Sequence, residues 1–196
     1  ITNGKDWRML VLAANARRGA QAKFMAKQWG VTTKKAEIAG VTVRTAIPAG
    51  IDPANQDRLF VHLHGGAYVI GAGKASLVEA VLIAHRVKIP VLSIDYRMPP
   101  EHPFPAAVDD VVAVWRSLLE QRPAKSMALG GTSAGGGLTL AATLRLIELG
   151  LETPGALWAG TPWADLSKTG DSLFTNEGID QKLVSYHGLL EGAAKL

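Results

Sequence analysis

The spacing of apolar residues changes along the chain, and this change separates predicted helices from predicted strands. Residues 6–29 carry apolar side chains at helical intervals, with one interruption, which predicts one or two amphipathic helices. Asp6 is of a type that caps a helix start, and Gly30 is of a type that ends a helix. Residues 35–48 alternate with a period of two, so we expect two short strands that turn at Gly40.

Short apolar runs recur from residue 58 onward and alternate with helical patterns. We predict buried strands at 58–64, 89–96, 125–131 and 155–160. Strands that alternate with helices favour a parallel sheet with helices on both faces. The predicted fold class is therefore α/β with a mostly parallel sheet, and we expect function at the carboxyl ends of its strands.

Three helices are expected between these strands. Ser76 and Glu79 have the spacing of a capping box, which predicts that a helix begins there. Pro105 suits the first turn of a second helix. The third helix is expected at 134–149, with Gly150 well placed to end it.

Composition narrows the class of protein. The chain has 196 residues, of which 47% are apolar and 19% charged, as is typical of a globular domain. It has no cysteine, so we expect neither disulfides nor thiolate metal sites. The net charge of +4 comes from scattered Lys and Arg residues, which argues against a nucleic-acid partner. No apolar run has the length of a membrane span and no signal-peptide pattern is present, so we expect a cytoplasmic protein.

A serine within a glycine-rich turn is the first candidate for chemistry. Residues 131–135 match G-x-S-x-G, a strand-to-helix turn that exposes a serine hydroxyl. Small neighbours leave room for the tight turn, and the helix that follows places partial positive charge near Ser133. The backbone N–H of Ala134 would be one donor to an oxyanion. Glycine-rich turns also bind phosphate, but no lysine follows in the P-loop pattern, so we favour a nucleophile.

A second glycine-rich loop follows the predicted strand at 58–64. His64, Gly65, Gly66 and Ala67 resemble the HGGG element that supplies further oxyanion donors. Glycines there let the main chain turn its N–H groups toward developing charge, and each donor is worth a factor of about 10²–10³ in rate. Either loop alone fits a structural turn, but the two in this order favour a serine hydrolase.

Three segments together resemble a known family. In this order, HGGAY, DYRMPPEHPFPAAVDD and GGTSAGGG are similar to the hormone-sensitive-lipase family (bacterial family IV) of α/β-hydrolase carboxylesterases. The likeness runs from about residue 40 to residue 168. It implies an α/β-hydrolase fold with a helical cap, in which 1–30 are N-terminal cap helices, 31–168 the core and 169–196 the start of a second cap segment.

The same resemblance implies roles for individual residues. Ser133 would be the acyl-forming nucleophile, and the oxyanion hole would be formed by Gly65, Gly66, Ala67 and Ala134. The implied reaction is hydrolysis of a small-molecule carboxylic ester, with no metal and no cofactor.

Two positions depart mildly from the family pattern. Ala67 replaces the usual third glycine but keeps its N–H, and Thr132 stands where many members have Asp. The segment that shapes the loop beside the site is expected to be structural and comprises Asp95, Tyr96, Glu101, His102 and Pro105.

The residues that would activate Ser133 are not found. In this fold the chain order is Ser, then Asp or Glu, then His, and the family places the last two after the seventh and eighth strands. Only one strand is predicted after Ser133. Asp165, Asp171 and Asp180 precede His187 and satisfy the order, but His187 lies in a predicted cap helix, so we do not expect it to be the base. The earlier histidines are expected to be structural: His62, His64, His85 and His102.

Three explanations of the missing acid and base stay open. The first, which we favour, is a longer esterase whose last strands lie beyond Leu196 or in a complementary C-terminal chain. The second is a catalytically inactive truncated hydrolase that folds as a homo-oligomer. The third is a small-molecule-binding module of the gibberellin-receptor type. Tyr68, Trp158 and Trp163 are candidates to line its pocket, although aromatic residues near strand ends are equally often core.

Overall fold

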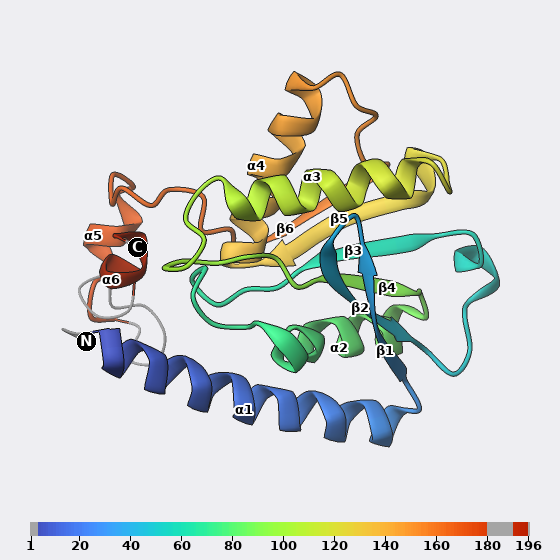
Figure 1. The fold of residues 1–196 in the computed structure, drawn as a ribbon, viewed down its shortest axis with the longest axis horizontal. Coiled ribbons are helices and arrows are strands. Elements are labelled where there is room, and N and C mark those ends of the chain that lie inside the picture. The colour runs from blue at the N-terminus through green and yellow to red at the C-terminus, as the bar shows by residue number, and fades with distance from the viewer. Residues whose placement is uncertain (1–3, 180–189, 196) are drawn as a thin grey trace.

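The computed structural model describes residues 4–179 and 190–195, which form a six-stranded sheet with helices on both faces (Figure 1). The strand order is β1-β2-β4-β3-β5-β6. The strands are β1 (Thr32–Ile38), β2 (Val41–Ile47), β3 (Leu59–Leu63), β4 (Val91–Ile94), β5 (Met127–Thr132) and β6 (Ala156–Gly160).

Four of the strands, β4, β3, β5 and β6, run parallel to one another. The strands β1 and β2 form an antiparallel hairpin, and β2 joins β4 in antiparallel register. The hairpin turns at Ala39 and Gly40, whose φ angles are 50° and 79°. The predicted α/β sheet and the predicted turn at Gly40 are both confirmed.

Helices cover both faces of the sheet. In Figure 1, α1 and α2 lie on one side of the sheet, and α3 and α4 lie on the other. None of the described helices is both long and apolar enough to cross a lipid bilayer. The helices are α1 (Gly4–Trp29), α2 (Leu77–Val87), α3 (Ala106–Leu119), α4 (Ala134–Glu148), α5 (Ser172–Thr175) and α6 (Glu191–Ala194), with 3-10 turns η1 (Pro53–Asn55), η2 (Gly73–Ser76) and η3 (Ala124–Ser126).

Each layer of helices forms an apolar core with the sheet. Trp115 of α3 and Leu138 of α4 pack in one core with Leu129 of β5. On the opposite face, Ala26 of α1 and Val81 of α2 belong to a second core. Full burial of such a Val or Leu side chain contributes about 1.5–3 kcal/mol. The two cores hold the central strands in place, and the candidate chemistry lies where those strands end.

The first helix, α1, is continuous through Gly19. It begins at Gly4, so Asp6 lies inside the first turn, and the prediction that Asp6 caps the helix is wrong. Gly19 does not interrupt the helix, and its missing side chain permits close packing of α1 on η2. A Cβ there would lie 3.2 Å from Cβ of Lys74. Gly30 ends the helix with a φ of 64°, as predicted.

Ser76 and Glu79 do not form the predicted capping box. Ser76 ends η2 with helical φ and ψ of −61° and −22°, so the chain is already turning when α2 begins. Its Oγ donates to the carbonyl oxygen of Gly73 at 2.9 Å. Glu79 instead contacts His62 and Thr132. The local pattern is therefore overridden by tertiary contacts.

The predicted end of α4 is confirmed, and the predicted start of α3 is one residue early. Pro105 caps α3, which begins at Ala106. Gly150 follows α4 with a φ of 65°, and its N–H donates to the carbonyl oxygen of Ile147 at 3.0 Å. Leu151 likewise donates to Leu146 at 3.0 Å, so the last carbonyls of α4 have partners.

The strand β6 lies at an edge of the sheet and, among the described residues, pairs only with β5. Leu157 and Trp158 of β6 are 46% and 42% exposed. On α4, which packs beside β6, Leu144 and Ile147 are 63% and 59% exposed. This edge therefore presents several large apolar side chains to solvent.

Candidate active site

Ser133 lies at the turn between β5 and α4. Its φ and ψ are 58° and −121°, a conformation that costs energy for a residue with a side chain. The neighbouring main chain holds it there. Its N–H donates to the carbonyl oxygen of Gly160 at 2.9 Å, and its carbonyl oxygen accepts from Gly137 and Trp163 at 3.0 and 2.9 Å. Its hydroxyl makes no hydrogen bond to any described residue.

The glycines that flank this serine are required by the approach of β3. A Cβ on either Gly131 or Gly135 would overlap the carbonyl oxygen of Leu63. A side chain at either position would therefore force β3 away from the turn. The prediction that small residues must flank Ser133 is confirmed.

The loop after β3 lies against the turn that carries Ser133. A Cβ on Gly65 would be 2.7 Å from the carbonyl oxygen of Thr132 and 3.5 Å from Cβ of Ser133. Gly66 has a φ of 130°, and a side chain there would overlap the carbonyl oxygen of Ile70. The two glycine-rich motifs, far apart in the sequence, therefore meet at one edge of the sheet.

Four backbone N–H groups, on the turn of Ser133 and the loop after β3, have no acceptor among the described residues. The N–H groups of Gly65, Gly66, Ala67 and Ala134 donate no hydrogen bond within the part of the chain that the structure describes. Ala67 and Ala134 are 5% and 0% exposed. Because buried N–H groups without a partner are rare in proteins, these groups are candidates to bind a negatively charged oxygen.

Ser133 and this loop line a single cavity of about 640 Å³. The helix α1 contributes Arg18 and Gln21 to the wall, and the segment after β6 contributes Trp163. Leu190, just before α6, closes part of another side. The cavity has the size of a small-molecule site.

His64 packs on Tyr96 at the base of the loop at 64–67 that follows β3. The two rings stack with centroids 4.2 Å apart and an interplanar angle of 9°. The Tyr96 hydroxyl donates to the carbonyl oxygen of His64 at 2.6 Å. His64 Nδ1 lies 3.0 Å from the carbonyl oxygen of Gly65 and so carries the proton. Burial lowers the pKa of His64 from 6.5 to about 4, so the ring is neutral at pH 7 and a poor base.

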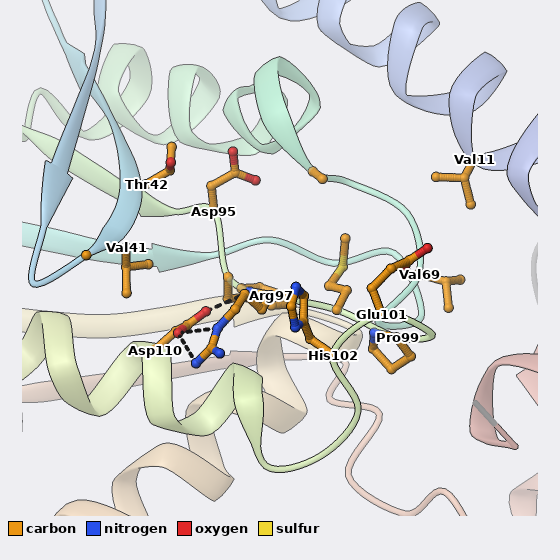
Figure 2. A pocket seen from close by; sticks show the side chains of 14 residues that line it. Val11, Val41, Thr42, Val69, Asp95, Arg97, Pro99, Glu101, His102 and Asp110 are labelled. Carbon is orange, nitrogen blue, oxygen red and sulfur yellow. Dashed lines mark hydrogen bonds and ion pairs between the residues drawn. The ribbon is translucent and has the colours of Figure 1, made fainter.

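A second cavity, of about 520 Å³, lies beside the proline-rich segment and does not include the serine (Figure 2). Arg97 binds the Asp110 carboxylate through its N–H, Nε and Nη2 at 2.8, 2.9 and 2.7 Å. Asp95 accepts from the N–H of Gly73 at 2.7 Å and lies 3.4 Å from Arg44 Nη2. These contacts agree with the structural role expected for this segment. Two further polar residues of the proline-rich segment, Glu101 and His102, are exposed and line this second cavity.

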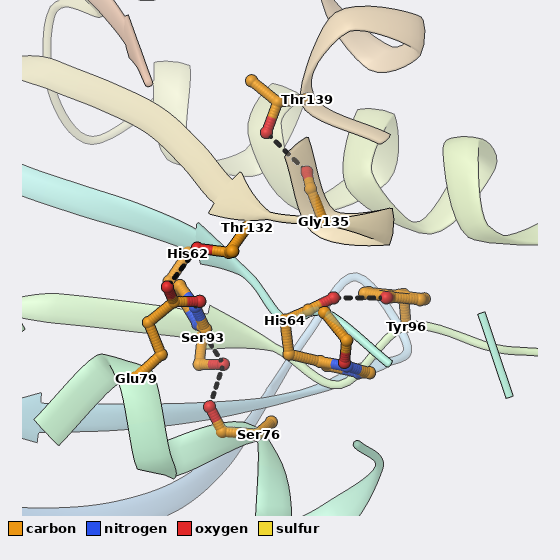
Figure 3. A network of polar contacts seen from close by, with 10 residues as sticks. His62, His64, Ser76, Glu79, Ser93, Tyr96, Thr132, Gly135 and Thr139 are labelled. Carbon is orange, nitrogen blue, oxygen red and sulfur yellow. Dashed lines mark hydrogen bonds and ion pairs between the residues drawn. The ribbon is translucent and has the colours of Figure 1, made fainter. Parts of the chain in front are cut away.

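A chain of polar side chains connects the serine turn to α2 and β4 (Figure 3). The Thr132 hydroxyl donates to one Glu79 oxygen, and the other Glu79 oxygen lies 2.9 Å from His62 Nε2. His62 Nδ1 lies 3.0 Å from Ser93 Oγ, which donates to the Ser76 carbonyl oxygen at 3.4 Å. Burial acts to raise the pKa of Glu79, but hydrogen bonds from His62 and Thr132 outweigh it and lower the pKa. Glu79 is therefore ionised at neutral pH, on the cavity wall.

Asp165 is committed to the loop that follows it. Its carboxylate accepts from the N–H groups of Ser167 and Thr169 at 2.8 and 3.0 Å and from both hydroxyls. Hydrogen bonds from Ser167 and Thr169 hold the pKa of Asp165 well below its usual range. Asp165 does not line the cavity of Ser133.

No described Asp–His pair is brought to the serine. Asp171 lies outside the cavity lining. Asp180 and His187 lie outside the described residues. His85 of α2 stacks on Trp29 with ring centroids 4.7 Å apart, as expected of a structural histidine.

Sequence reasoning missed Glu79 as a site residue and assigned it to a helix cap. The contact between Glu79 and Thr132 joins residues 53 positions apart, so no local pattern could reveal it. Of the aromatic candidates, Trp163 lines the cavity. Tyr68 packs on Trp163 with ring centroids 6.0 Å apart, and Trp158 lies on the exposed strand β6.

Comparison with known proteins agrees with this geometry. The family model of the alpha/beta hydrolase fold matches residues 60–193, and the chain belongs to this family. An acetyl-hydrolase of Streptomyces hygroscopicus is 41% identical over 139 residues, which are 70% of this chain and 46% of that protein. The crystal structure of an esterase E25 is 46% identical with a TM-score of 0.93, and the match covers 98% of this chain and 59% of that chain.

A second solved structure indicates the group of α/β hydrolases to which the chain belongs. An esterase from the bacterial hormone-sensitive lipase (HSL) family is 31% identical with a TM-score of 0.78, over 100% of this chain and 69% of that chain. Within the α/β hydrolases, the chain thus falls in the hormone-sensitive-lipase-like family IV group that the three motifs predict. It spans about half the length of the curated relatives it matches.

Proposed function

We propose that this chain is the nucleophile-bearing part of a carboxylesterase that hydrolyses small-molecule esters through an acyl-serine intermediate. The observation that carries the proposal is that Ser133 lines one cavity with Gly65, Gly66 and Ala67 and is followed directly by Ala134. The N–H groups of these four residues have no acceptor among the described residues. The relatives named acetyl-hydrolase and esterase support an ester as substrate.

The proposed reaction begins with attack of Ser133 Oγ on the ester carbonyl carbon, while a general base takes the hydroxyl proton. The carbonyl oxygen becomes an oxyanion and accepts hydrogen bonds from the four N–H groups, aided by the N-terminal end of α4. Collapse of this intermediate breaks the ester C–O bond, and the alcohol leaves with the proton held by the base. Water then attacks the acyl-serine by the same steps and releases the carboxylic acid.

We place the general base and its carboxylate partner in a C-terminal part of the enzyme, because no described Asp or His reaches Ser133. His64 is unsuitable since its pKa is about 4 and its Nδ1 donates to Gly65. A serine hydroxyl is a weak nucleophile without a base. We therefore expect little ester hydrolysis from the isolated 196 residues.

The cavity walls favour the proposed division into cap and core. Arg18 of α1 and Leu190 near α6 both line the cavity, although they lie at opposite ends of the sequence. This agrees with cap segments at 1–30 and 169–196 around a core at 31–168. The proposed substrate enters between cap and core.

The test is Ser133→Ala in the polypeptide that carries the complete hydrolase domain, assayed with an aryl acetate. We expect the turnover rate to fall by about 10⁴-fold or more. Ser126→Ala is the matched control, because Ser126 lies at the opposite end of β5 and its Oγ donates to the nearby carbonyl oxygen of Pro123 at 2.8 Å. Normal turnover by Ser133→Ala would contradict the proposal. Tight binding of a small molecule without turnover by the wild-type enzyme would favour a binding module instead.

A further inference from the structure

The polar chain behind the serine connects three adjacent parallel strands. His62 of β3 is in register with Ser93 of β4, and Thr132 ends β5 directly before the serine. Glu79 reaches this row from α2 and contacts both His62 and Thr132. One carboxylate therefore connects the helix on one face of the sheet to the last residue of the strand that presents Ser133 (Figure 3).

Glu79 is placed to act on the turn rather than to stabilise a helix end. Its side chain is 26% exposed, whereas that of His62 is fully buried. The charged or titratable groups around it are His62 in direct contact, His64 just after the same strand and Arg18 on the same cavity wall. The carboxylate thus lies at the boundary between the buried row and the cavity.

The hydrogen-bond roles fix the orientation of Thr132. An ionised carboxylate only accepts hydrogen bonds, so the Thr132 hydroxyl and His62 Nε2 must both donate to Glu79. Thr132 is in register with Gly160 on β6, and the missing side chain of that glycine leaves room for the Thr132 hydroxyl. A Cβ on Gly160 would be 3.2 Å from Thr132 Oγ1. The hydroxyl therefore lies beside the main chain of β6 while it donates to Glu79 of α2.

We propose that Glu79 is a positioning residue, which holds Thr132 and thereby keeps Ser133 Oγ aimed at the oxyanion loop. Ser133 has a strained backbone, and the residue before it must resist relaxation of that strain. The main-chain bond from Ser133 to Gly160 holds one side of the turn, and the Thr132–Glu79 bond holds the other. This inference rests on the proposed esterase function.

The first experiment compares Thr132→Val, Glu79→Ala and the double variant in the polypeptide with the complete hydrolase domain. Valine keeps the shape of threonine and removes only the donor. We expect each single variant to lower kcat by about 10- to 100-fold with little change in KM, because small misplacements of a nucleophile are costly. The double variant should be no slower than the slower single variant, because both changes break one contact. Thr132→Ser, which keeps the hydroxyl, should restore most of the rate.

The second experiment uses charge. Thr132→Asp places a carboxylate against Glu79, and two such groups cannot both ionise in contact without a large cost. At pH 7 we expect kcat of Thr132→Asp to fall by about tenfold or more relative to wild type, and this ratio should recover as the pH is lowered. Thr132→Asp combined with Glu79→Gln should recover the rate at pH 7. A role in stability alone would not produce this rescue.

A third measurement does not depend on turnover. In a Ser133→Ala background, the Thr132→Val change should raise the pKa of the Glu79 carboxyl, observed by carbon NMR, because it loses one donor. If the wild-type enzyme hydrolyses no ester, the proposed function fails while this measurement still tests the contact. The positioning role is overturned by an unchanged pKa of Glu79. It is also overturned by single variants within twofold of wild type, or by losses that multiply in the double variant.

Discussion

His62 and His64 lie two residues apart at the end of β3, and they support the candidate site in different ways. Both ring nitrogens of His62 have partners, in a row that reaches Thr132 through Glu79. His64 instead stacks on Tyr96, and its Nε2 is buried with no partner among the described residues. The first histidine supports the turn that carries Ser133, and the second supports the loop at 64–67, where we propose the oxyanion donors.

The difference shows two solutions to the burial of an imidazole. Around His62, an ionised carboxylate and a serine hydroxyl replace the water that the ring loses, so the cost of burial is met by hydrogen bonds. Around His64, no described charged side chain makes a hydrogen bond to the ring, and desolvation keeps the ring neutral. The His62 region is therefore sensitive to loss of a partner, whereas the His64 region is sensitive to gain of a proton.

The largest expected effect is that of His62→Leu. The substitution leaves the buried Ser93 hydroxyl and the Glu79 carboxylate without their shared partner, so the free energy of unfolding should fall by about 3 kcal/mol. Urea denaturation at pH 7 measures it. His102→Leu, at an exposed position, is the control and should change stability by less than about 0.5 kcal/mol. If the free energy of unfolding falls by less than about 1 kcal/mol in His62→Leu, the contacts of His62 with Ser93 and Glu79 contribute little to stability.

The next effect is acid destabilisation through His64. Its pKa is lowered from 6.5 to about 4 in the folded state, so the unfolded chain binds the proton more tightly. Stability should therefore fall as the pH drops from about 6.5 toward 4, and it should be unaffected by this group above 6.5. One pKa unit corresponds to about 1.4 kcal/mol, so the full loss is on the order of 3 kcal/mol. Urea denaturation at a series of pH values measures it.

His64→Phe is the matched variant for that experiment, because phenylalanine keeps a ring for stacking but cannot be protonated. Its stability should vary less with pH between 6.5 and 4.5. Below that range Glu79, whose pKa is lowered from 4.5, also begins to lose stabilising charge, so the comparison is cleanest above pH 4.5. An equal slope in both proteins would show that His64 is not the group responsible.

A smaller effect is expected for Tyr96→Phe. This change keeps the stacked ring but removes the hydroxyl that donates to the His64 carbonyl oxygen at 2.6 Å. Since that carbonyl is buried, stability should fall by about 1–2 kcal/mol, measured by thermal or urea denaturation. Unchanged stability would indicate that the stacked rings alone hold the base of the loop at 64–67.

The glycine-rich turn and loop can be predicted from the sequence, whereas the polar contacts behind them cannot. The turn at 131–135 and the loop at 64–67 are local motifs, because tight main-chain turns demand small residues at fixed spacing. The alternation of strands and helices likewise predicts the parallel sheet, and the structure confirms it. The hydrogen-bonded side chains behind the turn, Thr132, Glu79, His62 and Ser93, cannot be predicted in this way. Ser76 and Glu79 match a capping box, and only the fold shows that Glu79 turns toward His62 and Thr132 instead.

The smallest expected effect separates stacking from burial as the cause of the His64 behaviour. His85 also stacks on an aromatic ring, that of Trp29, but it is only half-buried on α2. Partial desolvation, with the charges of Lys88 and Arg86, lowers the pKa of His85. If burial rather than stacking governs the shift, His85→Phe should change the slope of stability between pH 6.5 and 4.5 far less than His64→Phe does. Equal changes would assign the effect to the stacked ring, and the contrast between His62 and His64 would then depend on Tyr96 rather than on lost solvation.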